Sequence, residues 1–447
     1  MEKKKYTARE AAYRSLILCE RDKKYSSLEI DSSIKRFSLE GADKGLYTAL
    51  VYGVIERRIT LDYIIGKLSS KPVDTLDTEV LTLLRLGLYQ LIWLDRIPDS
   101  AAVNETVNLA KKNAPRASSF INAVLRNFLR TMSKDALPYP SRNDMKRFLS
   151  VRYSCGEDVI DVLTDSGYDT EAVLAAFERH PDVTLRVNTL KITRDELLSQ
   201  LEKLGIDASA TEYSPYGIRL LKKTLPAEVS ELISCGLVYI QDEASQVAGF
   251  AADPAPGTVL IDTCACPGGK SFGAAMLMNN SGCVKSFDLH KNKLSLVESG
   301  AKRLGIIIIE TSEKDGSKRD DTLVECADTV LCDVPCSGLG VIAKKPEIRY
   351  KSHADFERLP EIQYSILKNS SAYVKKGGVL CYSTCTLNKV ENEEVVNRFL
   401  SENGEFKAED FKVGTIESHG GMLTLLPNVH GTDGFFVAKF RKNNELA

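Results

Sequence analysis

The chain has 447 residues, of which 43% are hydrophobic and 27% are charged, and its net charge is −2. This length predicts roughly two to four domains, and the composition is that of a globular protein, so a fibrous or disordered chain is excluded. No run of about 18 apolar residues occurs, so we expect no transmembrane helix and no membrane partner.

The eleven cysteines bear on the compartment of the protein. The first residues are charged and no apolar segment of a signal peptide follows them, so we expect no secretion. Many cysteines in a long chain without such a signal indicate reduced thiols in the cytoplasm rather than a disulfide framework.

The small net charge hides an asymmetry along the chain. Residues 1–150 hold 26 Lys and Arg against 18 Asp and Glu, whereas the remaining residues hold 33 against 43. The basic excess concentrates between Lys111 and Arg152, where ten basic side chains accompany two acidic ones. Such a stretch suits contact with a phosphate backbone, and it fits equally well a solvated helical face.

Residues 1–135 are expected to form an all-α domain. Apolar residues recur at helical spacing through 11–18, 81–89 and 120–126, and short polar or proline-containing breaks separate these stretches. The prolines of Leu137-Pro138-Tyr139-Pro140-Ser141 then indicate a linker.

A small α+β module is expected over residues 143–235. Val183-Thr184-Leu185-Arg186-Val187-Asn188 alternates like a strand, residues 195–202 have the pattern of an amphipathic helix, and Gly205 marks a turn.

Strands and helices alternate over residues 236–447, which is typical of a parallel sheet with crossover helices. We therefore expect an α/β, Rossmann-like domain. The strands expected in it lie at 258–262, 283–288, 306–310, 328–333, 378–384 and 434–440.

A glycine-rich turn follows the first of these strands. Such a turn lets a ligand approach the backbone closely. The pattern is neither Gly-x-Gly-x-x-Gly nor a Walker A loop, which disfavours a dinucleotide and a nucleoside triphosphate. The turn reads Thr263-Cys264-Ala265-Cys266-Pro267-Gly268-Gly269-Lys270.

Acidic residues follow the next three strands. Asp288 ends the second strand, where it could accept hydrogen bonds from ribose hydroxyls, and Asp315 follows the third as a candidate for the adenine side. Asp333 ends the fourth strand. Any one of these acids alone fits a cap or a surface residue, but the set at matching strand ends favours a nucleoside ligand.

Two cysteines lie just beyond strands, beside the same crevice: Cys336 after the fourth strand and Cys385 at the end of the fifth. Buried cysteine is commonly a plain small hydrophobe. The spacings between cysteines along the chain, including Cys264-x-Cys266, do not form the paired motifs of zinc knuckles, so we expect no metal site. We interpret the other thiols as core residues, namely Cys19, Cys155, Cys235, Cys283, Cys326, Cys332 and Cys381.

Five motifs resemble those of a known family. Residues 262–270, Asp333-Val334-Pro335-Cys336-Ser337-Gly338 and Tyr382-Ser383-Thr384-Cys385-Thr386-Leu387 resemble the signature motifs of RNA 5-methylcytosine methyltransferases. Gln241-Asp242-Glu243-Ala244-Ser245 and Asp433-Gly434-Phe435-Phe436 match further motifs of that family. The resemblance covers roughly residues 236–440.

The N-terminal region narrows the resemblance. Residues 84–90, 97–105 and 122–126 resemble the NusB antitermination fold. A NusB-like RNA-binding domain, a small ferredoxin-like or RRM-like module and a methyltransferase domain, in that order, are similar to the bacterial 16S rRNA cytosine-C5 methyltransferases of the RsmB, Sun or Fmu type.

This resemblance implies a class I methyltransferase fold, the cofactor S-adenosylmethionine and a covalent mechanism. It makes Cys385 the nucleophile that attacks C6 of cytosine, Cys336 the residue for product release, and Asp333 the acid near N3. It assigns cofactor contacts to the backbone of 264–270 and to Asp288, Asp315 and Asp333. The implied partner of a monomeric enzyme is 16S rRNA or a small-subunit assembly intermediate.

The sequence departs from the family pattern at two positions. Cys266 stands where alanine is usual, and Lys293 stands where arginine is common. Neither side chain has a role in the chemistry that the resemblance implies, so the expected activity and cofactor are unchanged.

Two alternatives stay open at this point. A related enzyme would methylate tRNA or another rRNA cytosine, against which the NusB-like region argues. A protein of another class would be a non-catalytic, NusB-like antitermination factor with a decayed methyltransferase domain. The intact Cys336, Cys385 and Asp333, and the intact turn at Pro267-Gly268-Gly269-Lys270, argue against it.

Overall fold

The computed structural model describes residues 6–22, 26–179, 182–221 and 225–444. The chain forms two compact units, Met1–Val162 with Lys344–Ser352 and Leu163–Ala343 with His353–Ala447. The boundaries of the three expected domains, at 1–135, 143–235 and 236–447, stay predictions. Within the described ranges, no helix is both long and apolar enough to cross a membrane.

The described residues of the first unit fold mainly into helices, which confirms the expected helical N-terminal fold. Helix α5 is buried on nearly all sides and packs against α1, α3, α4, α6 and α7. Its apolar run Leu83, Leu84, Leu86 and Leu88 is fully buried, which explains why its sequence is hydrophobic all round. The helices are α1 (Ala8–Asp22), α2 (Ser26–Phe37), α3 (Gly41–Glu56), α4 (Arg58–Leu68), α5 (Thr78–Trp93), α6 (Asp99–Asn113), α7 (Ser118–Thr131) and α8 (Met145–Tyr153).

The segment Lys344–Ser352 also belongs to the first unit, although it follows the fourth strand of the sheet in sequence. The hydroxyl of Tyr350 donates to the carbonyl of Ile55 at 2.5 Å and accepts from the N–H of Arg58 at 3.1 Å. Arg349 is 1% exposed and donates to the carbonyl of Tyr153 at 3.0 Å. No local sequence pattern indicates this excursion of the chain.

A small βαββαβ module begins the sheet-containing part of the second unit. Its antiparallel sheet has the order β2-β3-β1-β4, and α11 and α12 pack on its apolar side. The expected strand at 183–188 and helix at 195–202 are confirmed. The elements are β1 (Val183–Val187), α11 (Arg194–Lys203), β2 (Ala208–Ala210), β3 (Gly217–Leu220), α12 (Ala227–Ser234) and β4 (Val238–Ile240).

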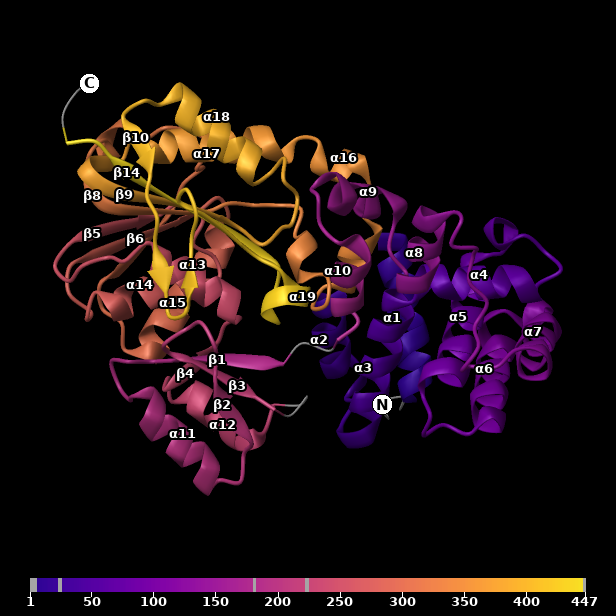
Figure 1. Ribbon diagram of the computed structural model, residues 1–447. Helices are drawn as coiled ribbons and strands as arrows, with labels where there is room; N and C mark the ends of the chain where they lie inside the picture. The colour runs from indigo at the N-terminus through magenta and orange to yellow at the C-terminus, as the bar shows by residue number, and fades with distance from the viewer. Residues whose placement is uncertain (1–5, 23–25, 180–181, 222–224, 445–447) are drawn as a thin grey trace. The chain divides into compact units, whose positions relative to one another are not determined.

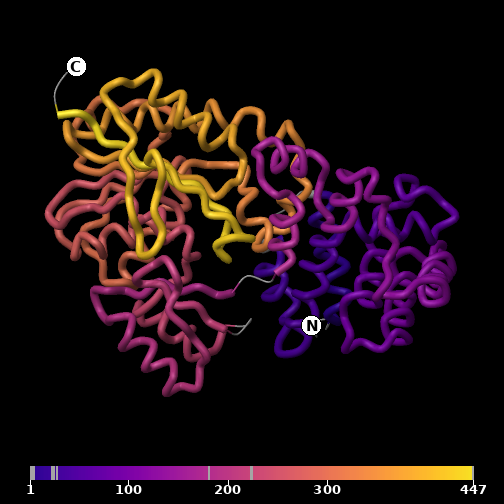
Figure 2. Tube along the Cα trace, viewed as in Figure 1, coloured from indigo at the N-terminus to yellow at the C-terminus, as the bar shows by residue number. Residues whose placement is uncertain are grey.

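Two buried side chains tie this module to helices that pack on the larger sheet of the same unit. Arg186 on β1 is 0% exposed, donates to the carbonyl of Gly273 at 3.4 Å and stacks over the ring of Phe250. Asn188 donates to the carbonyl of Leu304 at 2.8 Å. Figure 2 follows the chain from the module into the larger sheet.

The larger sheet has eight strands in the order β10-β14-β9-β8-β5-β6-β7, with β13 paired to β14. Strands β5 to β9 run parallel, whereas β14 is antiparallel to β9. The strands are β5 (Val259–Asp262), β6 (Cys283–Asp288), β7 (Ile309–Glu313), β8 (Ala327–Asp333), β9 (Val374–Thr384), β10 (Phe406–Ala408), β13 (Met422–Leu425) and β14 (Phe435–Lys442).

Helices cover both faces of this sheet (Figure 1). Helices α17 (Leu359–Ser371) and α18 (Glu393–Glu402) share an apolar core with one face. Helices α13 (Glu243–Ala251), α14 (Gly269–Leu277) and α15 (Lys291–Leu304) share another core with the opposite face. The expected α/β, Rossmann-like architecture is confirmed.

All six expected strands are present. The third is displaced: we expected 306–310, but β7 spans Ile309–Glu313. Ile306 belongs to the core under the sheet together with Leu304 at the end of α15, so its hydrophobicity reflects packing after a helix and not the start of a strand. The short strands β10 and β13 were not anticipated.

Candidate active site

The glycine-rich turn lies between β5 and α14, as expected. Gly268 has φ +110°, and a Cβ there would lie 2.4 Å from the ring of Phe272, so only glycine fits. The N–H of Ala265 donates to the carbonyl of Phe287 at 2.7 Å, which ties the turn to β6. The first amides of α14 therefore start at the carboxyl end of the sheet, where open α/β sheets bind ligands.

A buried hydrogen-bonded chain fixes the start of this turn. Asp262, the last residue of β5, is 1% exposed and accepts from the hydroxyl of Ser271 at 2.7 Å. Ser271 in turn accepts from Ser286 at 2.8 Å. Burial raises the pKa of Asp262 to about 6. Asp262 begins the first motif, but neither it nor Ser271 and Ser286 was among the predicted site residues.

The acids expected to hold a nucleoside follow neighbouring strands. Asp288 ends β6, and its carboxylate accepts from the N–H of His290 at 2.9 Å. The carbonyl of Asp288 accepts from Lys314, the residue before Asp315, at 3.0 Å. A hydrogen bond from Ser317 lowers the pKa of Asp315. The two carboxylates thus belong to adjacent loops at one edge of the sheet.

The two cysteines of the turn do not present reactive thiols. Burial raises the pKa of the Cys264 thiol well above its ordinary value, and Cys264 packs against the core on the α17 side. Burial, followed by the charge of Asp288, raises the pKa of Cys266 to about 12. Any contribution of these residues to ligand binding would therefore come from their backbone.

Asp333 lies at the centre of a polar cluster at the end of β8. Lys270 donates to its Oδ2 at 2.6 Å, and Ser383 donates to its Oδ1 at 2.7 Å. Lys270 is 7% exposed, donates to Ser245 at 3.2 Å and lies over the ring of Phe435 at 4.9 Å. The cluster joins Lys270 of the first motif to Asp333 of the second and Ser383 of the third.

Cys336 and Cys385 meet beyond the ends of β8 and β9, and their Sγ atoms lie 3.2 Å apart. The parallel register explains the encounter, because Asp333 pairs with Ser383 and the two chains then turn the same way. The hydrogen bond with Cys385 and burial raise the pKa of Cys336 well above its ordinary value. The structure thus brings together the pair that the sequence singled out.

Glu391 holds the two cysteine loops together. It is 0% exposed, and its carboxylate accepts from the N–H of Ser337 at 2.8 Å, from Gln363 at 2.8 Å and from Asn388 at 2.9 Å. The backbone carbonyl of Glu391 also accepts from Tyr382 at 2.6 Å. Sequence reasoning missed Glu391, and a carboxylate six residues after Cys385 gives no signal of this role.

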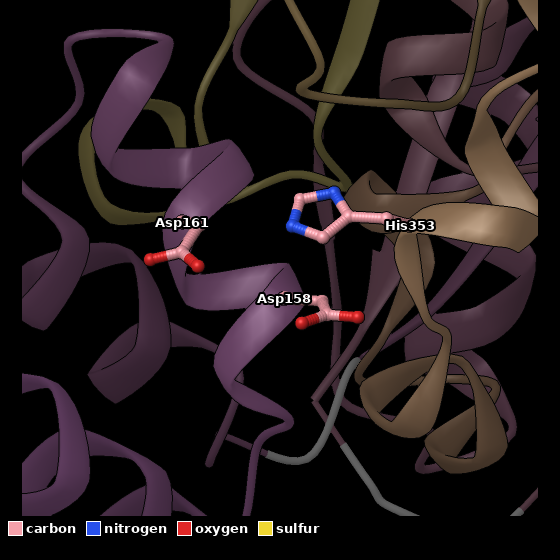
Figure 3. Close-up of side chains that lie close together, drawn as sticks. All are labelled: Asp158, Asp161 and His353. Atoms are coloured by element: carbon pink, nitrogen blue, oxygen red, sulfur yellow. The ribbon is translucent and has the colours of Figure 1, made fainter.

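The described residues contain one group that offers three metal-ligating atoms, Asp158, Asp161 and His353 (Figure 3). Asp158 and Asp161 belong to the first unit and His353 to the second, so this group supports no metal site. Within the first unit, Asp161 already accepts from Lys146 at 2.6 Å.

Fold and site together define a class of protein. Parallel strands β7-β6-β5-β8-β9 followed by antiparallel β14, a glycine-rich turn after β5 and acids after the next strands are the arrangement of a Rossmann-like methyltransferase. The solved structure of PH0851 covers 97% of the chain and 98% of its own, with a TM-score of 0.81 and 26% identity. A methyltransferase homolog protein from Pyrococcus horikoshii shares 29% identity over 64% of this chain and 98% of its own, with a TM-score of 0.55.

The family follows from three domain models and from curated relatives. The model of 16S rRNA methyltransferase RsmB/F matches residues 250–441, the NusB family model matches 6–130, and the RsmF/B-like ferredoxin-like domain matches 161–226. The probable ribosomal RNA small subunit methyltransferase B of Bacillus subtilis is 39% identical over 98% of this chain and 99% of its own. The ribosomal RNA small subunit methyltransferase B of Pseudomonas putida is 32% identical over 90% and 91%. The chain belongs to the RsmB/F methyltransferase family.

Proposed function

We propose that this protein transfers a methyl group from S-adenosylmethionine to C5 of a cytosine in 16S rRNA, through a covalent bond between Cys385 and C6 of the base. The observation that carries the proposal is the pair of thiols 3.2 Å apart, with Cys336 three residues after Asp333 and Cys385 two residues after Ser383 at the ends of two adjacent parallel strands. The substrate follows from the names of the full-length relatives in Bacillus subtilis and Pseudomonas putida.

The residues at the carboxyl edge of the sheet fit the cofactor. The turn 264–270 offers backbone donors and a glycine that leaves room for a ligand, and Asp288 and Asp315 offer acceptors for hydroxyl and amino groups. Asp333 closes the set on the side of the thiols. When bound there, S-adenosylmethionine supplies the electrophilic methyl group.

Covalent addition makes C5 of cytosine reactive. The thiolate of Cys385 forms a bond to C6, and the C5–C6 double bond electrons move so that C5 becomes the nucleophile that takes the methyl group. A proton passed from the ammonium of Lys270, which lies 2.6 Å from Oδ2 of Asp333, through that carboxylate to N3 would draw electrons from the ring. The target base must leave its stack for C6 to reach the thiolate.

Cys336 is the proposed base for release. Before addition, Cys385 is the largest cause that raises the pKa of Cys336, so Cys336 keeps its proton. Once Cys385 is bonded to carbon, that cause disappears while burial remains, and the release step requires the Cys336 thiol first to pass its proton to solvent. Its thiolate then removes the proton from C5, the C5–C6 double bond returns, and the bond from Cys385 to C6 breaks.

Two cysteine variants test the mechanism. With substrate RNA and S-adenosylmethionine, Cys336→Ala should accumulate a protein–RNA adduct on a denaturing gel, whereas Cys385→Ala should give neither adduct nor methylated product. Cys332→Ala is the matched control, because it removes a buried thiol four residues earlier on the same strand. A stable adduct with Cys385→Ala would exclude Cys385 as the nucleophile.

The substrate needs a separate test. Methyl transfer to 16S rRNA, naked and in small-subunit assembly intermediates, followed by bisulfite mapping, should yield a single modified cytosine. A product on tRNA or on other rRNA instead would favour the alternative specificity. Absence of S-adenosylmethionine binding in calorimetry would favour the non-catalytic, NusB-like RNA-binding role. We propose a cytoplasmic, monomeric enzyme that uses no metal.

A further inference from the structure

A polar cleft of about 340 Å³ lies within the second unit, outside the site described above. Its walls come from the end of α10 (Thr170–Ala176), strands β1 and β3 of the small module, the start of α13, and the loops around Gly340 and Thr432. Six charged side chains line it: Arg179, Asp182, Arg219, Asp242, Glu243 and Asp433. The size is that of a site for a small organic group.

The backbone that lines the cleft is hydrogen-bonded to the loop of Cys385. Gly340, which lines the cleft, donates its N–H to the carbonyl of Cys385 at 3.0 Å. Gly434, the residue after Asp433, donates to the carbonyl of Gly340 at 2.8 Å. A Cβ on Gly340 would lie 1.9 Å from the carbonyl oxygen of Gly434, so the two backbones are in direct contact. The cleft is therefore adjacent to the nucleophile loop.

The charges of the cleft favour hydrogen-bond donors over phosphate. Four carboxylates outnumber two guanidinium groups, so a phosphate would be repelled. Oε1 of Glu243 accepts from the N–H groups of Tyr213 and Ser214 at 2.5 and 2.9 Å, which fixes the carboxylate.

The second oxygen of Glu243 is the unusual feature. Glu243 is 2% exposed, and its Oε2 has no hydrogen-bond partner among the described residues. The nearest cation is Arg219, 3.5 Å away. A buried carboxylate oxygen without a hydrogen bond is costly unless a ligand supplies a donor. Asp242 adds a second fixed acceptor, since its Oδ1 accepts from Ala244 and Asp433 at 3.0 and 3.2 Å.

We infer that this cleft receives the base of a nucleotide next to the target cytosine and selects a base with an exocyclic amino group. The inference rests on the proposed function. Unpaired RNA bases are read along their Watson–Crick edges and stacked on arginine planes, and carboxylates accept from base amino groups. Arg179 and Arg219 would supply the plane, and Glu243 and Asp242 the acceptors. Uracil offers carbonyl oxygens in place of the amino group, so these carboxylates disfavour it.

The test uses the full-length protein and short RNAs that contain the cytosine mapped in the wild-type reaction. Each RNA carries A, C, G or U at the nucleotide before or after that cytosine, and kcat/KM for methylation is measured for each. At one of the two positions, uracil should lower kcat/KM by about tenfold relative to the amino-bearing bases. Equal values for all of these RNAs would overturn the inference.

Two variants locate the selection in the cleft. Glu243→Gln keeps Oε1 as an acceptor and turns Oε2 into a donor, so it should reduce the discrimination against uracil to about twofold. Asp242→Asn changes the second proposed acceptor at a less buried position, and it should also reduce the discrimination against uracil, which provides the test if Glu243→Gln does not fold. Glu228→Gln, an exposed carboxylate on α12, makes the same chemical change outside the cleft and should keep the tenfold preference.

Two results separate this inference from the proposed function. If the wild-type protein methylates no cytosine at C5, the proposed function fails. If it does so but the cleft variants discriminate as the wild type does, only the inference about the cleft fails.

Discussion

Strands β8 and β9 each have one cysteine inside the sheet and another four residues later, beyond its end. Cys332 and Cys381 are 1% and 2% exposed, and burial raises their pKa values to about 11 and about 12. Cys336 and Cys385 are partly exposed and face each other at 3.2 Å. The same side chain is therefore a core residue or a candidate reactive group according to its place relative to the strand end.

The physical reason lies in what surrounds each pair. Inside the sheet, Cys332 packs into the core on the α17 side and Cys381 into the core on the α13 side. Beyond the strands, the backbone turns into loops whose amides need partners, and Glu391 supplies an acceptor for Ser337. The loops thereby hold their thiols at the crevice.

The largest expected effect is the loss of activity in Cys385→Ala, compared with replacement of the buried thiol of Cys381 on β9. Cys385→Ala should lower methyl transfer on the order of 10⁴-fold, because the covalent route is lost. Cys381→Ala should keep the rate within about twofold, because that thiol only packs. Initial rates with 16S rRNA check both, and comparable rates for the two variants would contradict the distinction.

Glu391→Gln tests whether the carboxylate of Glu391 holds the two cysteine loops in place. The amide keeps one acceptor oxygen but places an N–H donor either against Asn388 or against both Ser337 and Gln363. We expect kcat to fall about tenfold with little change in KM, and the adduct to persist during turnover, because Cys336 is misplaced.

Glu394→Gln is the control for that variant, since Glu394 is an exposed carboxylate on α18, three residues further along the chain. It should match the wild type. A Glu391→Gln enzyme with unchanged kcat and adduct level would show that the loops hold their positions without this carboxylate.

The pH dependence of stability tests the buried carboxyl group of Asp262 at the end of β5. Its folded pKa of about 6 is above the ordinary 3.8, mainly because of burial. This carboxyl therefore supports the folded state fully below pH 3.8, and the support is lost as pH rises through about 6. Asp262→Asn removes this pH-dependent loss of stability. The free energy of unfolding of the variant, relative to that of the wild type, should therefore rise by up to ~3 kcal/mol between pH ~4 and ~7. Urea unfolding of both proteins at the two pH values measures the difference.

The smallest effect concerns stability alone. Cys332→Ala should lower the free energy of unfolding by about 1 kcal/mol, because it leaves a small cavity in the core. The native protein should also resist iodoacetamide at Cys332 and Cys381, whose thiols are buried and protonated. Alkylation sites read by mass spectrometry check this, and rapid labelling of Cys332 would place it outside the core.

Much of the fold was accessible from local patterns. The six strands, the glycine-rich turn and the helical N-terminal fold follow from apolar periodicity and turn residues, which act over short stretches of chain. The displaced third strand marks the limit of this approach, because an apolar residue such as Ile306 fits equally well just after a helix and in a strand. The roles assigned to the site residues stay predictions.

The sequence by itself determined which residues stand at strand ends, and hence that Asp288, Asp333, Cys336 and Cys385 share one edge of a sheet. Only the tertiary structure decided their partners. Lys270 reaches Asp333 across 63 positions, Glu391 reaches Ser337 across 54, and the segment Lys344–Ser352 joins the first unit. Spacing governs contacts within a helix or a turn, whereas these contacts depend on strand order and on how loops fold over it.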